Sequence, residues 1–213
     1  MKKTILSFLT AIILLTVTAQ ADFKPIPKSE ITTVKNAITN RNEQIQTLIC
    51  PFVQTKKMAV LKGEVVTKGN MYFQKNDRFR WEYVGENPFV FVQNGEKYFS
   101  LMNGKVSEIK DNSTRLFQEI AKLVTSSING DILENTKKFT IEYQENNNFV
   151  LIHLTPIPKS MKNFISKIKL YFNKTNYLVS KIEILEGEED TTTIQFENVK
   201  VNQTINPQIF ELK

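Results

Sequence analysis

The sequence predicts a mainly β protein, an unclosed antiparallel barrel of about 10 or 11 strands with an N-terminal and an interior helix as its lid. Three observations predict this fold. Apolar residues alternate with polar ones from Cys50 onward, polar turns recur at intervals of roughly 8–12 residues, and two stretches have helical spacing instead. A sheet this wide with one apolar face must curl or be covered. Two helices are too few to sandwich it, but they are enough to cover one side.

The first 21 residues have the pattern of a secretory signal peptide. Lys2 and Lys3 precede the apolar stretch Ile5–Val17, and Ala19-Gln20-Ala21 places small residues before Asp22. We expect cleavage there, which leaves residues 22–213 as a single, soluble exported domain. An uncleaved N-terminal anchor is the alternative interpretation. The apolar stretch is short for a transmembrane helix, which favours cleavage.

Charge, cysteine and histidine content narrow the classes of function. The formal charge of +6 falls to +4 once Lys2 and Lys3 are removed, and the basic residues are not clustered as in a nucleic-acid binder. Cys50 is the only cysteine, so no intramolecular disulfide can form, and we expect it to be buried. His153 is the only histidine and lies in an apolar strand, so we expect a structural role and no metal or other cofactor.

The N-terminal helix is predicted from an apolar stripe. Ser29 is a candidate N-cap, and the residues that follow it at three-to-four spacing are Ile31, Val34, Ile38, Ile45, Leu48 and Ile49. From Cys50 the period changes to two, which predicts a first strand over Phe52–Lys56. A second strand is predicted over Val60–Val66, with Gly63 as a bend or bulge within it.

The stretch Gly69–Tyr83 is unusually aromatic and predicts two further strands. Its apolar residues alternate with polar ones on either side of the polar turn Lys75-Asn76-Asp77, and they are Met71, Phe73, Phe79, Trp81 and Tyr83. We interpret this face as the wall of a cavity for an apolar ligand. An ordinary packed core gives the same alternation and is the alternative.

Hairpins and the interior helix follow. Phe89–Gln93 and Lys97–Leu101 flank Asn94-Gly95, and Asn103-Gly104 leads into Lys105–Lys110. The helix is capped by Asn112 or Ser113, ends at Asn129-Gly130, and carries a broad apolar face composed of Leu116, Phe117, Ile120, Ala121, Leu123, Val124 and Ile128. A face this wide predicts contacts on more than one side, or a helix that covers something.

The remaining chain predicts five more strands and a short closing segment. The strands are Phe139–Tyr143, Phe149–Thr155, Ser166–Phe172, Val179–Leu185 and Thr191–Val199, and the closing segment is Pro207–Phe210. The inward candidates on these strands are Ile152, Leu154, Ile168, Leu170, Phe172, Ile182, Ile184, Ile194 and Phe196. One domain accounts for the whole mature length.

No catalytic constellation stands out, so we do not expect an enzyme. The chain has no G-x-S-x-G elbow, no P-loop and no G-x-G-x-x-G motif, and a single histidine within a strand cannot complete a triad. The acidic residues Glu186, Glu188, Glu189 and Asp190 fall in a turn containing a glycine and predict a solvated loop. A lipid hydrolase remains the weakest alternative.

A succession of motifs resembles the LolA family of periplasmic outer-membrane lipoprotein carriers. The motifs are Phe52-x-Gln54-x-Lys56, Gly69-x-Met71-x-Phe73-x-Lys75, Phe79-x-Trp81, Pro88, Asn94-Gly95 and the closing Pro207–Phe210. The resemblance implies a hydrophobic cavity between an open barrel and a helical lid, with no metal or nucleotide. It further implies that the cavity takes lipoprotein acyl chains from an inner-membrane transporter and passes them to an outer-membrane acceptor, and we expect a monomer. The alternative is a carrier or sensor for another lipid or apolar ligand on the same scaffold.

Site residues follow from the alternation together with this resemblance. The expected acyl-chain cavity is lined by Met71, Phe73, Phe79, Trp81, Phe89, Phe91, Leu116, Phe117, Ile120, Ile152, Leu154, Leu170 and Ile184. Family members place a basic residue at the end of the Gly69–Lys75 strand, where it holds backbone carbonyls of the lid. The resemblance therefore implies Lys75 as a lid latch, with Arg78 or Arg80 as substitutes.

Overall fold

The computed structural model describes residues 22–60, 63–109, 115–187 and 189–212. The predicted signal peptide and the Asn112 or Ser113 cap lie outside these residues. None of the described helices is long and apolar enough to cross a membrane.

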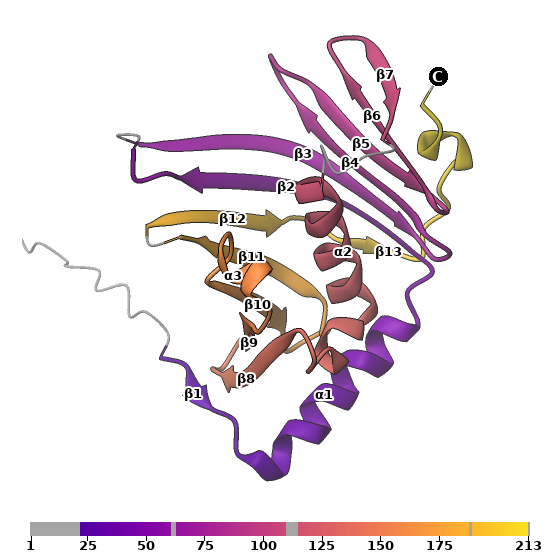
Figure 1. Cartoon of the computed structure of the whole chain (residues 1–213). Coiled ribbons are helices and arrows are strands. Elements are labelled where there is room, and N and C mark those ends of the chain that lie inside the picture. Colours follow the sequence, from indigo (N-terminus) through magenta and orange to yellow (C-terminus); the bar gives the residue numbers. More distant parts are fainter. Residues whose placement is uncertain (1–21, 61–62, 110–114, 188, 213) are drawn as a thin grey trace, which may run out of the picture.

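The described chain is mainly β and forms a single antiparallel sheet. Its strands are β1 (Lys24–Pro25), β2 (Thr47–Lys57), β3 (Glu64–Gln74), β4 (Arg78–Val84), β5 (Phe89–Asn94), β6 (Lys97–Met102), β7 (Lys105–Glu108), β8 (Phe139–Glu145), β9 (Phe149–Pro156), β10 (Lys167–Asn173), β11 (Val179–Glu186), β12 (Asp190–Phe196) and β13 (Lys200–Val201). They lie side by side in the order β1, β8 to β12, β2 to β7, with β13 beside β2. The sheet curls, but its two ends, β1 and β7, do not pair, which confirms the unclosed barrel (Figure 1).

The helices gather on the concave side of this sheet. They are α1 (Lys28–Glu43), α2 (Arg115–Asn129) and α3 (Lys159–Lys162), with the 3-10 turn η2 (Asp131–Glu134). A further 3-10 turn, η3 (Pro207–Phe210), lies instead against the outer side of β4 and β5. Figure 1 shows α2 crossing the concave side and α1 running along its open base. The N-terminal and interior helices are therefore where the lid was predicted.

The first helix is shorter than predicted. It begins after Pro27 without a side-chain cap and ends at Glu43, so Ser29 is not its cap. Ile45 lies in the connection, and Leu48 already belongs to β2. The apolar stripe predicted a longer helix because Ile45 and Leu48 are both buried. Burial of these two residues is compatible with a helix and equally with a loop followed by a strand. Pairing of β2 with β3 along its whole length decides in favour of the strand.

The two strands predicted over Val60–Val66 and Gly69–Gln74 are one continuous strand. β3 begins at Glu64 and pairs with β2 from Lys57↔Glu64 to Thr47↔Gln74. Val60 is 89% exposed in the turn before it, and Gly63, at φ 134°, precedes the strand rather than bending it. The unbroken register with β2 carries the strand past Lys68 and Gly69.

A second, smaller core lies on the outer face of β5. Val90 and Val92 point away from the concave side and are covered by Ile205 and Phe210. The short closing segment that the sequence predicted is the turn η3, capped by the Asn206 side chain, which accepts a hydrogen bond from the Gln208 amide at 3.0 Å. Pro207 at its first position favours such a turn over a strand.

Candidate functional site

The aromatic residues of β3, β4 and β5 form one packed cluster on the concave face. Its predicted members, each at most 4% exposed, are Met71, Phe73, Phe79, Trp81 and Phe91. Cross-strand pairing brings Met71 opposite Trp81, and Trp81 opposite Phe91. Phe89, half-buried, extends the cluster through Tyr83, with ring centroids 6.3 Å apart. In this conformation the rings contact one another more than they line open space.

Phe52 is a fully buried member of the cluster that the sequence did not single out as a site residue. Its ring stacks on Trp81 with centroids 3.9 Å apart and an interplanar angle of 27°. It lies across Gly69, where a Cβ atom would come within 2.3 Å of the ring and 2.2 Å of the Glu82 carbonyl oxygen. Gly69 in the middle of a strand was the available signal, because a glycine there marks close approach of a neighbour.

The other half of the concave face is aliphatic. Ile152, Leu154, Leu170 and Ile184, from β9, β10 and β11, are each no more than 2% exposed. The register places Leu170 opposite Ile152, which gives a continuous apolar surface across the strands. The sequence therefore predicted correctly which residues face inward here.

The helix α2 covers this face. Ala121, Leu123, Val124 and Ile128 are buried in the same core as the sheet residues. The hydroxyl groups along the helix donate to its own backbone, as Ser127 does to the Leu123 carbonyl at 2.7 Å, so a helix with polar residues can lie against an apolar surface. The predicted site residues Leu116, Phe117 and Ile120 belong to α2, but their side chains lie outside what the structure describes.

An apolar hollow of about 180 Å³ lies between α2 and the aliphatic half of the sheet and is partly open to solvent. Its lining is formed by Lys122, Leu123, Ser126, Ile132, Asn135, Lys138, Phe139, Met161, Ile165, Ile168 and Ile184. Of the predicted cavity residues whose side chains the structure describes, only Ile184 is among them. Met161 and Ile165 were missed because they lie in the connection between β9 and β10, where no strand or helix period shows which side chains turn inward.

A second, more polar hollow of about 270 Å³ lies between the β3–β4 turn and α2. Phe73 and Phe79 reach it from the sheet, and Lys122 and Thr125 reach it from the helix. Two of the predicted cavity residues thus border open space, at the end of the aromatic cluster closest to Lys75.

Lys75 contacts the end of the first helix. Its side-chain amine donates to the carbonyl of Glu43, the last residue of α1, and its backbone amide donates to the Gln46 carbonyl at 2.9 Å. Carbonyls at a helix C-terminus have no partner within the helix, and a cation there is also favoured by the helix dipole. Lys75 therefore contacts a backbone carbonyl at the end of α1, and its role as a lid latch stays a prediction.

Arg80, one of the two proposed latch substitutes, lies on the opposite face of the sheet. It alternates with Phe79 and Trp81, so its guanidinium lies on the outer side, 2.7 Å from Glu82 and 2.9 Å from the Ile209 carbonyl of η3. Arg80 therefore fastens the closing segment and does not contact the lid in this structure. Arg78, the second substitute, begins β4 and lines the polar hollow.

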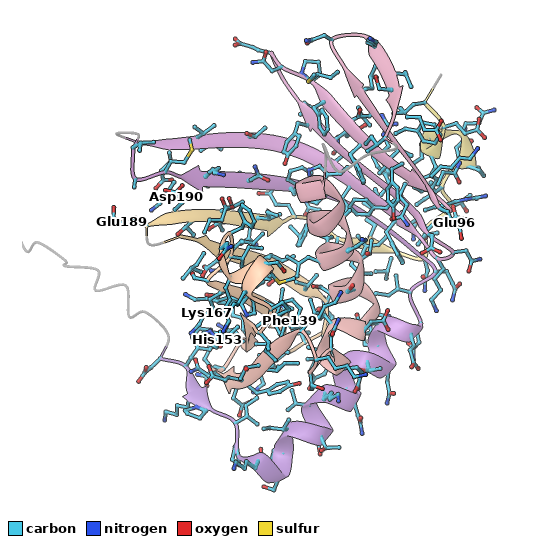
Figure 2. All side chains as sticks on the ribbon, viewed as in Figure 1. Glu96, Phe139, His153, Lys167, Glu189 and Asp190 are labelled. Carbon is cyan, nitrogen blue, oxygen red and sulfur yellow. The ribbon has the colours of Figure 1, made fainter. Side chains whose placement is uncertain are left out.

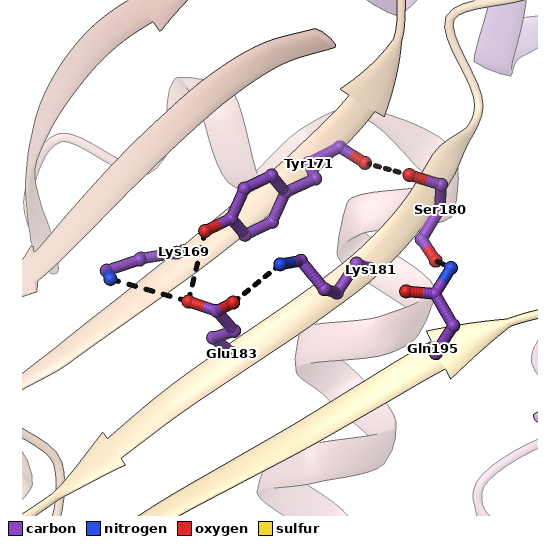
Figure 3. Close-up of polar contacts among 6 residues, drawn as sticks. All are labelled: Lys169, Tyr171, Ser180, Lys181, Glu183 and Gln195. Carbon is purple, nitrogen blue, oxygen red and sulfur yellow. Dashed lines mark hydrogen bonds and ion pairs between the residues drawn. The ribbon is translucent and has the colours of Figure 1, made fainter. Parts of the chain in front are cut away.

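The outer face of β10 and β11 carries a charged network (Figure 3). Glu183 accepts hydrogen bonds from Lys181 at 2.6 Å and Tyr171 at 3.0 Å, and Lys169 lies 3.4 Å away. Burial opposes ionisation of Glu183, but these partners outweigh it and lower its pKa. Because every member is partnered, we interpret the network as structural.

His153 lies beside this network on β9, close to Lys167 (Figure 2). Burial, and then the positive charges of Lys167 and Lys169, lower its pKa, so the ring is neutral at pH 7. One ring nitrogen lies 3.2 Å from Gln144 Oε1, and the other is buried without a partner among the described residues. Within the described chain, only one of the two ring nitrogens therefore has a hydrogen-bond partner of the kind that a structural role predicts.

Two of the four acidic residues predicted in a solvated loop belong to strands instead: Glu186 ends β11 and Asp190 begins β12. Glu189 is exposed, and Glu188 lies outside the described residues. Glu186 pairs with Lys56 at 3.0 Å and accepts a hydrogen bond from Thr192 at 2.7 Å, and Asp190 accepts one from the Ala59 amide at 2.8 Å. These contacts join the β11–β12 turn to the β2–β3 hairpin. Within the described ranges, no three His, Cys, Asp or Glu side chains gather closely enough to hold a metal ion.

Comparison with known proteins gives consistent sequence matches. Residues 43–213 match the family model described as "Outer membrane lipoprotein carrier protein LolA". An outer-membrane lipoprotein carrier protein of Francisella tularensis is 30% identical over 149 residues, covering 69% of this chain and 67% of that protein. One from Pseudomonas aeruginosa is 25% identical over 144 residues, covering 68% of this chain, and the match spans 66% of its length, just under two thirds.

Solved structures resemble the chain more distantly. A LolA superfamily protein from Nitrosomonas europaea covers 84% of this chain and 97% of its own, at 13% identity and a TM-score of 0.45. The Mycobacterium tuberculosis lipoprotein LppX covers 84% of this chain and 99% of its own, at 11% identity and a TM-score of 0.49. The sequence matches are therefore the ones that bear on the family.

Proposed function

The chain belongs to the LolA family of outer membrane lipoprotein carrier proteins, and from this premise we propose that it is a non-enzymatic periplasmic carrier of lipoproteins. It would hold the acyl chains of its cargo between α2 and the concave face of the sheet. The observation that carries this proposal is a continuous apolar surface over β3–β5 and β9–β11, covered by one helix and already hollow at one end. Each buried methylene of an acyl chain is worth roughly 0.8 kcal/mol, so shielding the chains is a strong driving force.

The size of the apolar hollow implies that α2 moves when cargo binds. Its volume of about 180 Å³ is smaller than that of most sites that enclose a drug-sized ligand, roughly 300–1,000 Å³. A triacylated cargo needs more room than the closed arrangement offers. We therefore place the incoming chains first at Ile165 and Met161, with displacement of α2 opening the aliphatic half of the sheet behind them.

Lys75 is the proposed latch of this lid. Its bond to the Glu43 carbonyl ties the β3–β4 turn to the end of α1, and the polar hollow separates that turn from α2. A lysine holds a carbonyl through a single charged amine, without the planar fork of arginine, so the contact is readily broken. That suits a lid that must open and close.

The latch predicts a difference between Lys75, in the β3–β4 turn, and Arg80, on β4. Lys75→Met should speed cargo uptake and release several-fold, because the end of α1 loses its tie. Arg80→Met should destabilise the fold by about 1–3 kcal/mol through loss of charged hydrogen bonds, yet leave uptake rates unchanged. Stopped-flow uptake of a fluorescent fatty acid measures the rates, and urea unfolding measures the stability. Equal uptake rates for Lys75→Met and the unaltered chain would refute the latch.

The carrier function is tested by transfer of a lipoprotein from detergent. Purified chain is mixed with a triacylated lipoprotein in micelles, the detergent is diluted, and size-exclusion chromatography shows whether the cargo stays soluble in a one-to-one complex. Met161→Glu, which places a charge in the hollow, should abolish the complex. Val106→Glu is the matched control, since Val106 is also half-buried but lies on β7. Precipitation of the cargo in the presence of the unaltered chain would contradict the proposal.

A second candidate function is supported by the lysines of the hollow. Lys122 and Lys138 line a mainly apolar space, which suits a ligand with an apolar tail and an anionic head, such as a free fatty acid. Stoichiometric binding of fatty acid together with failure to keep lipoproteins soluble would favour this alternative. The transporter and acceptor implied by the family, and a monomeric state, remain predictions.

A further inference from the structure

The connection between β9 and β10 presents apolar side chains to solvent. In this turn (residues 157–165, containing α3), Phe164 is 70% exposed and Ile157 is 44% exposed. Among the described residues, Phe164 is the only aromatic side chain in the set of exposed large apolar ones. Scattered aliphatic residues on a surface are ordinary, but an aromatic ring this exposed, in a short connection with a second exposed apolar residue, indicates an interaction site.

The turn is held in place, so this exposure is built into the fold. At one end the Ile157 amide donates to the Lys138 carbonyl at 2.8 Å, and at the other the Ser166 amide donates to the Leu185 carbonyl at 2.8 Å. Within the turn, the Phe164 amide donates to the Met161 carbonyl at 3.0 Å. The ring therefore stays outside because the backbone around it is fixed.

The same turn forms one wall of the apolar hollow. Met161 and Ile165 line the hollow, whereas Phe164, between them in sequence, faces solvent. Phe139 and Ile168 continue the lining from the neighbouring strands. The exposed ring is thus one residue away from a side chain that leads into the interior, at the mouth of the site.

Positive charge surrounds the exposed residues. The lysine rim (Lys137, Lys138, Lys159 and Lys162) is exposed on the turn and on the segment bonded to it, and residues 157–167 contain three lysines and no acidic residue. Figure 2 shows Phe139 and Lys167 in this region. Glu134, the acid closest in sequence to Lys137 and Lys138, is paired with Lys35 at 2.7 Å. The turn itself is therefore cationic, and Glu186 at the adjoining end of β11 is paired with Lys56 at 3.0 Å.

We propose that the turn docks the mouth of the hollow onto an anionic phospholipid bilayer. An aromatic ring and an aliphatic side chain enter the interface between headgroups and acyl chains, and lysines around them pair with anionic headgroups. In this orientation Met161 and Ile165 face the membrane, so an acyl chain passes between bilayer and hollow without crossing water. The docking does not depend on which cargo is carried.

Vesicle co-sedimentation of the full chain tests the docking. The chain should bind vesicles of phosphatidylglycerol with phosphatidylethanolamine and not vesicles of phosphatidylcholine alone, and binding should weaken as salt rises. Lys159→Gln with Lys162→Gln should weaken binding about 25-fold, since each lysine near an anionic surface contributes roughly a factor of five. Phe164→Ser should weaken it about tenfold.

Matched variants at the far end of the sheet supply the controls. Lys97→Gln with Lys105→Gln removes the same charge from exposed positions of β6 and β7, and Met102→Ser removes an apolar side chain that is 58% exposed. Both should bind vesicles like the unaltered chain. Equal losses in the controls would mean that general charge or hydrophobicity, and not this turn, governs binding, and would overturn the proposal.

Two further outcomes separate docking from carriage. The Phe164→Ser variant should still take up lipoprotein from micelles, because Phe164 does not line the hollow. If the unaltered chain binds vesicles but takes up no lipoprotein, the membrane docking is supported and the proposed carrier function is refuted. Failure to bind vesicles of either composition would overturn the docking. The exposed ring would then be assigned to a protein partner.

Discussion

At the scale of single residues, the aromatic cluster depends on one glycine. Gly69 lies beneath the Phe52 ring, and that ring stacks on Trp81. A side chain at position 69 would occupy the space of the ring and press on the β4 backbone at Glu82. Interiors this tightly packed respond to a single added methyl group.

Gly69→Ala should therefore destabilise the chain by about 1–3 kcal/mol through overpacking, measured by urea unfolding. The double variant with Phe52→Ala should lose less stability than the sum of the two single variants, because removal of the ring relieves part of the clash. Additive losses would show that the clash with the ring is not what Gly69 avoids.

Cys50 is a second residue with a measurable consequence. It is 1% exposed, and burial raises its pKa from 9.0 to about 12. Because the pKa is higher in the folded chain, folding favours the protonated thiol. That contribution is complete below pH 9 and is lost as the pH rises toward 12.

We expect stability to fall by about 1 kcal/mol between pH 9 and pH 10 from this thiol alone. Unfolding curves of the unaltered chain and of Cys50→Ala at both pH values isolate the effect, since the variant should lack this part of the change. The native thiol should also resist alkylation at pH 8 and react once the chain is unfolded in urea. Rapid alkylation of the folded chain would contradict the burial.

At the scale of elements, α1 packs closely against the end of α2, but two buried polar groups of α1 there have no hydrogen-bond partner among the described residues. Gly130, at φ 81°, ends α2, and a Cβ there would lie 3.4 Å from Thr39 of α1. Thr39 Oγ1 and Asn42 Nδ2 are buried without hydrogen-bond partners among the described residues. A buried polar group left unpaired costs about 1–3 kcal/mol, which favours a lid that separates readily.

Asn42→Leu should stabilise the closed lid by about 1 kcal/mol and slow ligand uptake, because an apolar side chain replaces the unpaired amide. Thermal unfolding and fatty-acid uptake rates measure the two effects. Asn36→Leu, the same change at an exposed position of α1, should alter neither. Faster uptake by Asn42→Leu would indicate that this contact does not hold the lid.

At the scale of the whole molecule, the curled sheet has two apolar faces with different covers. The outer core beneath η3 is small and is fastened by Arg80, whereas the concave face carries most of the buried residues and is covered by helices. A cover made of helices can move as a body without breaking strand pairing. This division predicts that ligand binding changes the concave side and leaves the outer core intact.

Trp81, the only tryptophan, reports on the concave side. If acyl chains enter beneath α2 as far as the aromatic cluster, a fatty acid brominated on its chain should quench most of the Trp81 emission. Acrylamide, which stays in water, should quench little, because Trp81 is 4% exposed. A bound brominated chain that leaves the emission unchanged would confine the ligand to the hollow near Ile184 and assign the aromatic rings to ordinary core.

The sequence by itself determined the unclosed mainly β fold and the inward residues, because alternation records which face of a strand is buried. Phe79, Trp81, Ile152 and Leu154 are inward as their spacing predicts. Only the tertiary structure decided where that face is packed and where it is hollow, since lining and packing give the same alternation. Met161 and Ile165 reach the hollow from a turn without periodicity, and Arg80 faces away from the lid because β4 meets η3 on its outer side. Such contacts join segments far apart in the chain, and no local pattern encodes them.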